Sequence, residues 1–277
     1  MNTPGISKHH VTPLGGGGGI TAIILAGGLG TRLRSVVSEV PKCMAPVNGI
    51  PFIHFIVWFL KNEGIEHFIF SLGYKHEIIT GYLDKTFPQL NKQYSIEQEP
   101  LGTGGAIKKA LSLVQTDFAV VLNGDTMFNV HIGELVNTHQ QKKASCTIAL
   151  KEMKQFTRYG SVETDTDDRI TAFNEKTYCE KGLINGGVYV INKNSLQDKE
   201  LPESFSFERD YLEKFLASEK IFGVQNEYYF IDIGVPEDYQ KFQDDYNLIL
   251  SKKKYNKTGN TELLDDFFEG LASLTDF

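Results

Sequence analysis

The stretch AIILAGGLGTRLRSVVSEVPKCMAPV combines bare backbone with positive charge near the start of the chain. Gly27, Gly28 and Gly30 follow an apolar run and carry no side chains, so a ligand can approach the main-chain N–H groups. Arg32 comes directly after them, and its planar guanidinium suits phosphate oxygens. A proline–lysine pair then ends at Lys42. The pattern predicts a site for a polyphosphate.

Two common nucleotide-binding motifs do not fit this stretch. Its glycine spacing is not GxGxxG, and no acidic residue follows a second strand about 20 residues on, so an ordinary dinucleotide site is not predicted. The Walker phosphate loop is also absent from the sequence. The glycines and positive residues therefore indicate another kind of phosphate site.

Strands and helices alternate over the first half of the chain. Strand-like apolar runs occupy 21–28, 65–74, 93–99, 117–125 and 145–153. Helical patterns occupy 52–64, 76–87, 103–114 and 132–143. This order predicts βαβ units, hence an α/β, Rossmann-like fold of three layers with a mostly parallel central sheet. The ligand site is then expected at the carboxyl ends of the strands.

The second half of the chain is richer in β structure and is expected to form a smaller part of the fold. Residues 160–176 are predicted to form a hairpin that turns at 165–168. The strand over 183–191 contains a double glycine, which indicates a bulge or a close backbone approach. A helix is predicted over 206–217, and a strand, a turn and a helix over 228–250.

Composition narrows the class of protein. The chain has 277 residues, of which 41% are hydrophobic, enough for one sizeable core. Its formal net charge of −7 repels nucleic acid and anionic membrane, so an anionic ligand needs a local positive cluster. Three cysteines without CxxC spacing favour a reducing compartment. With no long apolar run and no apolar signal region, the sequence predicts a cytoplasmic protein.

Both ends of the chain differ from its middle. Residues 1–19 end in five glycines and are expected to be a flexible extension or a tag. One domain is expected over 20–250. Residues 251–277 read as a spacer and a short acidic amphipathic helix, which packs on its own domain or docks into a partner protein. A homo-oligomer also stays open.

Six segments, in order, resemble the sugar-1-phosphate nucleotidylyltransferases. The first is GGxGTRLR followed by PKxM, and the others are EPLGTGGAI (99–107), LNGD (122–125), NEK (174–176), NGGVYV (185–190) and IDIGVPEDY (231–239). RLRSVVSEVPK and MAPVNGIPF look most like the bacterial guanylyltransferases that use D-glycero-α-D-manno-heptose 1-phosphate. The resemblance implies GTP and a heptose or hexose 1-phosphate as substrates, Mg²⁺ as cofactor, and a β-rich sugar-binding part.

The resemblance also implies a role for each matching residue. Arg32 would grip the β- and γ-phosphates, Lys42 the α-phosphate, and Lys176 the sugar phosphate. Asp125 and Asp232 would bind one Mg²⁺ through carboxylate oxygens. The nucleotide-binding set is Leu25, Ala26, Gly27, Gly28, Gly30, Thr31, Arg32, Glu99, Gly102, Thr103, Asn123 and Gly124. The sugar-phosphate-binding set is Gly160, Glu175, Lys176, Asn185, Gly186 and Gly187.

Glu99 bears on the choice of nucleobase. Guanine presents two adjacent donors on its Watson–Crick edge, and one carboxylate accepts from both. Uracil and thymine present a single donor between acceptors, which a carboxylate repels. If Glu99 faces the base, guanine is favoured; the alternative is a solvent-facing position at a strand end.

Cys43 departs from the family pattern, which has proline at this position. Loss of the proline is expected to loosen the loop that carries Lys42. A thiol beside phosphate-binding charge is also expected to have a lowered pKa and to be open to oxidation.

Other functions stay open at this point. The same chemistry could use mannose 1-phosphate with GTP, or another pair of nucleoside triphosphate and sugar 1-phosphate. A non-catalytic nucleotide-binding subunit of the same fold is a further alternative, and so is a fusion whose C-terminal helix recruits a partner. Taken alone, Asp125 could cap a turn after Asn123 and Gly124, and Lys42 could be a surface lysine.

Overall fold

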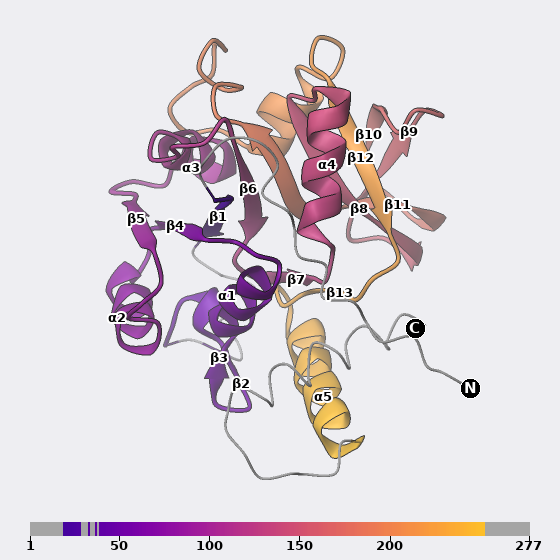
Figure 1. The fold of residues 1–277 in the computed structure, drawn as a ribbon. Coiled ribbons are helices and arrows are strands. Elements are labelled where there is room, and N and C mark those ends of the chain that lie inside the picture. The colour runs from indigo at the N-terminus through magenta and orange to yellow at the C-terminus, as the bar shows by residue number, and fades with distance from the viewer. Residues whose placement is uncertain (1–18, 29–32, 34–36, 38, 253–277) are drawn as a thin grey trace, which may run out of the picture.

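A nine-stranded sheet forms the centre of the fold in the computed structural model, which describes residues 19–28, 33, 37 and 39–252 (Figure 1). Its strands are β1 (Thr21–Ala26), β4 (His67–Leu72), β5 (Lys92–Ile96), β6 (Phe118–Asn123), β8 (Cys146–Phe156), β9 (Gly160–Thr164), β10 (Ile170–Lys176), β11 (Cys179–Asn192) and β12 (Ile221–Asn226). From one edge the order is β5, β4, β1, β6 and β11. There the sheet divides, because β11 pairs both with β8, which carries β12, and with β9, which carries β10.

The first part of the sheet is parallel, as the sequence predicts. β1 pairs in parallel with β4 and with β6, and β4 pairs in parallel with β5. Helices α1 (Phe52–Asn62), α2 (His76–Thr86) and α3 (Gly102–Leu111) connect these strands, and α4 (Ile132–Lys142) precedes β8. A parallel pair needs such a crossover connection, so the alternation in the sequence leads directly to this half of the sheet. The predicted α/β class is confirmed.

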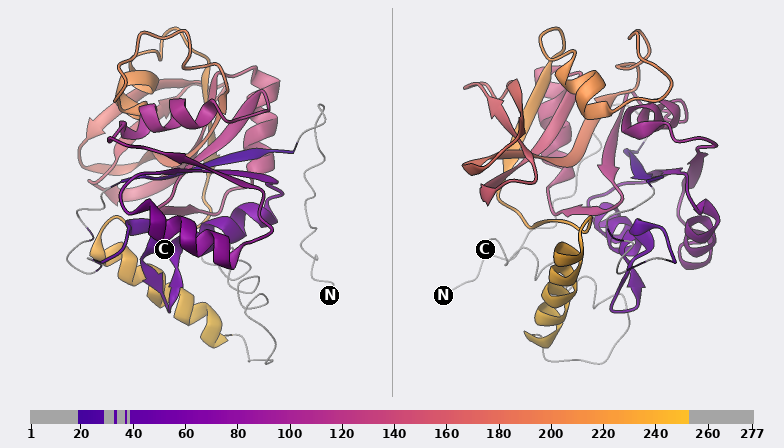
Figure 2. Two further views of the ribbon diagram at one scale, coloured as in Figure 1. Left: turned by 90° about the vertical axis from the view of Figure 1, so that its left-hand side faces the viewer. Right: turned by 180° about the vertical axis from the view of Figure 1, so that it is seen from behind.

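Alternating side chains sort the core onto the two faces of the sheet. On β6, Val120 and Leu122 join the cluster that contains α1, α2, α4 and α5 (Pro236–Lys252). Ala119 and Val121 point to the other cluster, with α3 and the π-helical segment η3 (Phe207–Glu213). Three layers result. In the left view of Figure 2 the sheet is seen edge-on, and the yellow helix α5 lies below it.

Two β features of the second half are confirmed. β9 and β10 are antiparallel neighbours, and the turn between them is closed where the Asp165 N–H donates to the Arg169 carbonyl at 2.9 Å. The register of β11 against β8 shifts between Asn185 and Tyr189, so the double glycine lies at an irregularity in the strand. The irregularity lies where one edge of β11 passes from β9, which pairs with Leu183 and Ile184, to β6, which pairs with residues 188–192.

Other elements differ from the prediction. The helix expected over 206–217 is a short π-helix over Phe207–Glu213, in which the buried rings of Phe207 and Tyr211 stack with centroids 5.3 Å apart. β12 was not predicted, because its short run is broken by Gly223 and its partner β8 lies far earlier in the chain. The hairpin of β2 (Pro46–Val47) and β3 (Ile50–Pro51) is also additional. So is β7 (Thr126–Phe128), which pairs with β13 (Phe230–Asp232), the strand expected within 228–250. Strands of two or three residues leave little periodicity to detect.

The predicted tail over 1–19 and the predicted C-terminal helix lie almost wholly outside the described residues. Within the part that the structure describes, no helix combines the length and the hydropathy needed to cross a bilayer.

Candidate active site

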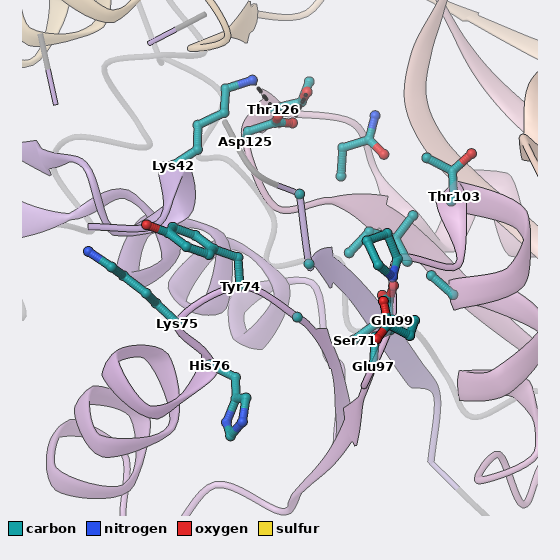
Figure 3. A pocket seen from close by; sticks show the side chains of 18 of the residues that line it. Lys42, Ser71, Tyr74, Lys75, His76, Glu97, Glu99, Thr103, Asp125 and Thr126 are labelled. Carbon is teal, nitrogen blue, oxygen red and sulfur yellow. Dashed lines mark hydrogen bonds and ion pairs between the residues drawn. The ribbon is translucent and has the colours of Figure 1, made fainter. Parts of the chain in front are cut away.

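Two adjoining clefts open at the carboxyl ends of the parallel strands. The larger cleft has a volume of about 930 Å³ and lies over the ends of β1, β4 and β6 (Figure 3). The smaller cleft, about 420 Å³, lies over β9, β10 and the break in β11. Among the residues that the structure describes, four line both clefts: Asn123, Thr126, Glu208 and Asp232. Ligands in the two clefts would therefore meet at these side chains.

The glycine loop after β1 borders the larger cleft. Gly27 has no room for a side chain, because a Cβ there would come within 2.7 Å of the Glu97 carboxylate. Gly28 is exposed and lines the cleft with an open space above it. Leu25 also lines the cleft. Bare main chain therefore faces the cleft, as the sequence predicts.

Three of the predicted nucleotide-binding residues cannot be placed, and two lie beneath the cleft. Gly30, Thr31 and Arg32 are outside the described residues. Ala26 is buried and Gly124 donates its N–H to the Leu25 carbonyl at 2.8 Å. This contact ties the end of β6 to the end of β1 and so supports the floor of the cleft.

Two glutamates from the end of β5 enter the larger cleft, together with Gly102 and Thr103. Glu99 is exposed, whereas Glu97 is half-buried and its Oε2 accepts from the Leu101 N–H at 3.0 Å. In Figure 3 both glutamates lie together, away from Lys42. Sequence reasoning missed Glu97, although the two-residue spacing from Glu99 would place both on the same side of an extended chain.

Lys42 lies between the two aspartates that were predicted to bind metal. Its ammonium forms ion pairs with Asp125 and, at 3.4 Å from Nζ to Oδ1, with Asp232. The Lys42 side chain is only 12% exposed, so water screens these pairs weakly. The structure therefore brings together one cation and two carboxylates from segments far apart in the chain.

The backbone fixes both carboxylates. Asp232 lies opposite Thr126 in the β7–β13 pair, and the Ile233 N–H donates to the Asp125 carbonyl at 3.0 Å. Asp232 Oδ1 also accepts from the Gly234 N–H at 2.7 Å. The small β7–β13 pair, of which the sequence predicted only the strand β13, is thus the element that positions the acidic pair.

The expected reactivity of Cys43 is wrong. Cys43 follows Lys42 in the short helix η2 (Lys42–Met44) and its side chain turns into the core, with 3% of its surface exposed. Burial, with a smaller contribution from the charge of Asp125, raises the pKa of the thiol from 9.0 to about 12. Cys43 is therefore a neutral core side chain, because desolvation outweighs the nearby Lys42 charge.

The smaller cleft gathers all six residues predicted for the sugar phosphate: Gly160, Glu175, Lys176, Asn185, Gly186 and Gly187. Glu175 and Lys176 are exposed on β10. Asn185 bridges the break in β11, since its Oδ1 accepts from the Gly187 N–H and its Nδ2 donates to the Tyr189 hydroxyl, both at 2.9 Å. The break in β11 at 185–187 is therefore shaped by the Asn185 side chain as well as by the two glycines.

The clefts contain the features that a nucleotidyl-transfer site needs: bare backbone, and a lysine paired with two carboxylates, one of which lies where the two clefts meet. Residues 21–248 match the model of the nucleotidyl transferase family. The chain belongs to this family.

Relatives within the nucleotidyl transferase family give finer comparisons. The D-glycero-α-D-manno-heptose 1-phosphate guanylyltransferase of Aneurinibacillus thermoaerophilus is 52% identical over 222 residues, which cover 80% of this chain and 96% of the relative. The protein of the same name from Campylobacter jejuni is 46% identical, over 80% and 97% of the two chains. The crystal structure of HddC from Yersinia pseudotuberculosis complexed with GMP-PN has a TM-score of 0.75 at 36% identity, and the match covers 82% of this chain and 99% of HddC.

Several cleft residues escaped the sequence analysis. Tyr74, Lys75 and His76 line the larger cleft, and Tyr159 and Glu213 the smaller. Tyr74 and Lys75 lie between β4 and α2, and His76 is the first residue of α2. Tyr159 lies between β8 and β9, and Glu213 ends the π-helix, so no periodic pattern points to a ligand. The strand end before Tyr74 was the available signal, because loops after parallel strands border the site.

Proposed function

We propose that this protein transfers GMP from GTP to a sugar 1-phosphate, giving a GDP-sugar and pyrophosphate, and that the sugar is D-glycero-α-D-manno-heptose. The observation that carries the proposal is the meeting of two clefts at Asp232, whose carboxylate shares the Lys42 ammonium with Asp125 on the side of the larger cleft. A nucleoside triphosphate fits the larger cleft, with its phosphates toward the junction. A sugar 1-phosphate in the smaller cleft then faces the α-phosphorus. The guanylyltransferase names of the two relatives support the choice of substrates.

The reaction needs charge and alignment rather than a covalent intermediate. An oxygen of the sugar phosphate attacks the α-phosphorus, a new P–O bond forms, and the bond to the bridging oxygen of pyrophosphate breaks. Lys42 is placed to stabilise the charge that builds on the α-phosphate, and Lys176 to hold the incoming phosphate. Arg32 is proposed to bind the β- and γ-phosphates. Alignment of two anions by these cations supplies much of the rate.

Asp125 and Asp232 fit a Mg²⁺ site of the kind that phosphate substrates complete. The described residues contain no group of three or more acidic, histidine or cysteine side chains that could hold a metal alone. Two carboxylates match the habit of Mg²⁺, which takes one or two protein carboxylates and completes its octahedron with phosphates and water. When bound there, the ion would neutralise phosphate charge. Lys42 would then turn from the carboxylates toward the substrate.

Base selection is proposed to rest on the carboxylates at the end of β5. Glu99 reaches the cleft from an exposed position and Glu97 from a fixed, half-buried one. Substituting Glu99→Gln and Glu97→Gln separately tests both. Loss of discrimination against UTP and dTTP in Glu99→Gln would support Glu99 as the residue that reads guanine. Loss only in Glu97→Gln would move that role to Glu97.

The experiment that tests the function is product identification. Purified protein, GTP, Mg²⁺ and D-glycero-α-D-manno-heptose 1-phosphate should give GDP-heptose and pyrophosphate, seen by mass spectrometry, and EDTA should stop the reaction. A product from mannose 1-phosphate alone would retain the chemistry and replace the sugar. Because the reaction uses GTP and the thiols are free, we also propose a cytoplasmic location.

A further inference from the structure

Glu208 is the one carboxylate from η3 that lines both clefts. It is half-buried and comes from the part of the chain that was predicted only as a helix. π-Helical turns are rare and occur often at functional sites. No role follows for Glu208 from the reaction described above.

The Glu208 carboxylate accepts hydrogen bonds from three hydroxyl groups. Its Oε2 accepts from Thr103 Oγ1 at 2.9 Å and from Ser206 Oγ at 3.1 Å, and its Oε1 accepts from the Tyr189 hydroxyl at 3.4 Å. Thr103 lines the larger cleft at the start of α3. Tyr189 is buried under the smaller cleft. One side chain thus joins the walls of both clefts.

The hydrogen bonds run in one direction toward Glu208. Asn185 Nδ2 donates to the Tyr189 hydroxyl at 2.9 Å, and that hydroxyl donates to Glu208. On the other side the Phe207 N–H donates to Thr103 Oγ1 at 2.9 Å, and Thr103 donates to Glu208. Each hydroxyl accepts from nitrogen and donates to the carboxylate, so an acceptor-only group at this position fixes the polarity of the whole series.

Asn185, at the far end of this hydrogen-bond series from Thr103, shapes the break in β11, which borders the smaller cleft. Asn185 Oδ1 accepts from the Gly187 N–H at 2.9 Å, and Gly187 has a φ of +72°. From these contacts, and resting on the proposed function, we propose that Glu208 is a positioning residue that couples the two substrates. Binding of the nucleotide against Thr103 fixes Glu208. Glu208 in turn fixes the break in β11 through Tyr189 and Asn185, and this break receives the sugar 1-phosphate. By reciprocity, the sugar 1-phosphate tightens nucleotide binding.

The Glu208→Gln variant tests this coupling, because an amide puts a donor where one of the hydroxyl donors points. We would measure the affinity for guanosine 5′-(α,β-imido)triphosphate by calorimetry, with and without saturating D-glycero-α-D-manno-heptose 1-phosphate. The wild type should bind the analogue at least ~5-fold more tightly when the sugar 1-phosphate is present, within the usual range of coupling. In Glu208→Gln this factor should fall below about 2-fold, while the affinity for the analogue alone changes less than about 3-fold.

Two further variants separate coupling from general damage. Tyr189→Phe removes the hydroxyl between Glu208 and Asn185 and should reduce the coupling as Glu208→Gln does, with no added loss in the double variant. Glu180→Gln is the control, because Glu180 is exposed on β11 and lines neither cleft. It should retain the coupling.

The outcomes distinguish this inference from the proposed function. A wild type without turnover would overturn the function and this inference together. A wild type with turnover but with a coupling factor near one, or an unchanged factor in Glu208→Gln, would overturn the role of Glu208 alone. An equal loss of coupling in Glu180→Gln would also overturn it, because the effect would then not belong to the hydrogen-bond series.

Discussion

At the scale of single residues, Lys42 offsets the negative charge of the two aspartates at the site. Its ammonium is nearly buried between two carboxylates, and no other cation is within ion-pair distance of either aspartate among the described residues. A lysine in this position is a compact charge on a flexible stem, so it can shift from the carboxylates to a phosphate over a short distance. Among the described residues, the charge of Asp125 and Asp232 is therefore offset by the Lys42 side chain.

Lys42→Met should lower kcat by about 10²–10³-fold, because a charge that stabilises the transition state is lost. Steady-state rates of pyrophosphate release measure the effect. Lys181→Met is the matched control, since Lys181 is exposed on β11 and pairs with Glu152 away from both clefts. A Lys42→Met enzyme with nearly normal kcat would contradict the role of Lys42.

His139 makes stability depend on pH. It is 3% exposed, and its ring nitrogens contact Thr147 Oγ1 at 3.1 Å and Asn192 Oδ1 at 3.0 Å. Burial lowers the pKa of His139 below its ordinary value of 6.5, and the Asn192 hydrogen bond opposes this less strongly. The unfolded chain therefore binds this proton at a higher pH than the folded protein does, so stability is lost as the pH falls below about 6.5.

Urea unfolding between pH 7.5 and 5.5 checks this expectation. The midpoint should fall with acidification, and the fall should be smaller in His139→Gln. The same slope in His139→Gln as in the wild type would refute the assignment to His139.

At the scale of elements, the break in β11 forms the floor of the smaller cleft. Gly187 has a φ of +72°, and a Cβ there would come within 2.6 Å of Asn123 Nδ2. An alanine in this position meets both backbone strain and a contact with a cleft residue. The strand is therefore interrupted where the main chain must lie against Asn123.

Gly187→Ala should cost about 1–2 kcal/mol of unfolding free energy and raise the KM for the sugar 1-phosphate. Gly81→Ala on α2 is the contrasting variant, because a Cβ there meets nothing within 4 Å. It should stabilise the protein by about 0.5–1 kcal/mol and leave KM unchanged. Equal effects of the two changes on KM would argue against a special role for the break in β11.

Helix α5 is fastened to α1 and to the hairpin that follows the Lys42 segment. The buried ring of Phe242 contacts the rings of Phe52 and Phe55, with centroids 5.1 and 5.4 Å apart. The Tyr239 hydroxyl donates to the Pro46 carbonyl in the hairpin after η2. α5 therefore holds α1 and this hairpin beside β13.

Phe242→Ala should destabilise the protein by about 3–5 kcal/mol, because it leaves a cavity among aromatic rings. Chemical unfolding measures the loss, and Phe242→Leu should lose clearly less. A change below 1 kcal/mol for Phe242→Ala would show that α5 does not hold the core together as described.

At the scale of the whole molecule, local patterns determine the parallel half of the sheet and distant pairings determine the rest. The βαβ order predicted β1, β4, β5 and β6, since each strand and its following helix are neighbours in sequence. β12 pairs with β8, so that Ile221 lies opposite Cys146. No local pattern reveals a pairing between residues so distant in the chain.

The candidate site follows the same division. Motif residues such as Asp125, Asp232 and Asn185 were predicted from their strings, and the structure gathers them along the two clefts. Glu208 and Glu97 escaped because their positions depend on the π-helix and on the turn after β5. The burial of Cys43 was also invisible, because it depends on the direction in which η2 turns its side chains.

The two clefts are proposed to accept GTP and a heptose 1-phosphate. Pyrophosphate release with Mg²⁺ tests this proposal when GTP, ATP, CTP, UTP and dTTP are each combined with D-glycero-α-D-manno-heptose, mannose and glucose 1-phosphates. We expect the highest kcat/KM for GTP with the heptose. Turnover with UTP or dTTP in place of GTP would contradict the choice of base, and nucleotide binding without turnover on any sugar would contradict catalysis itself.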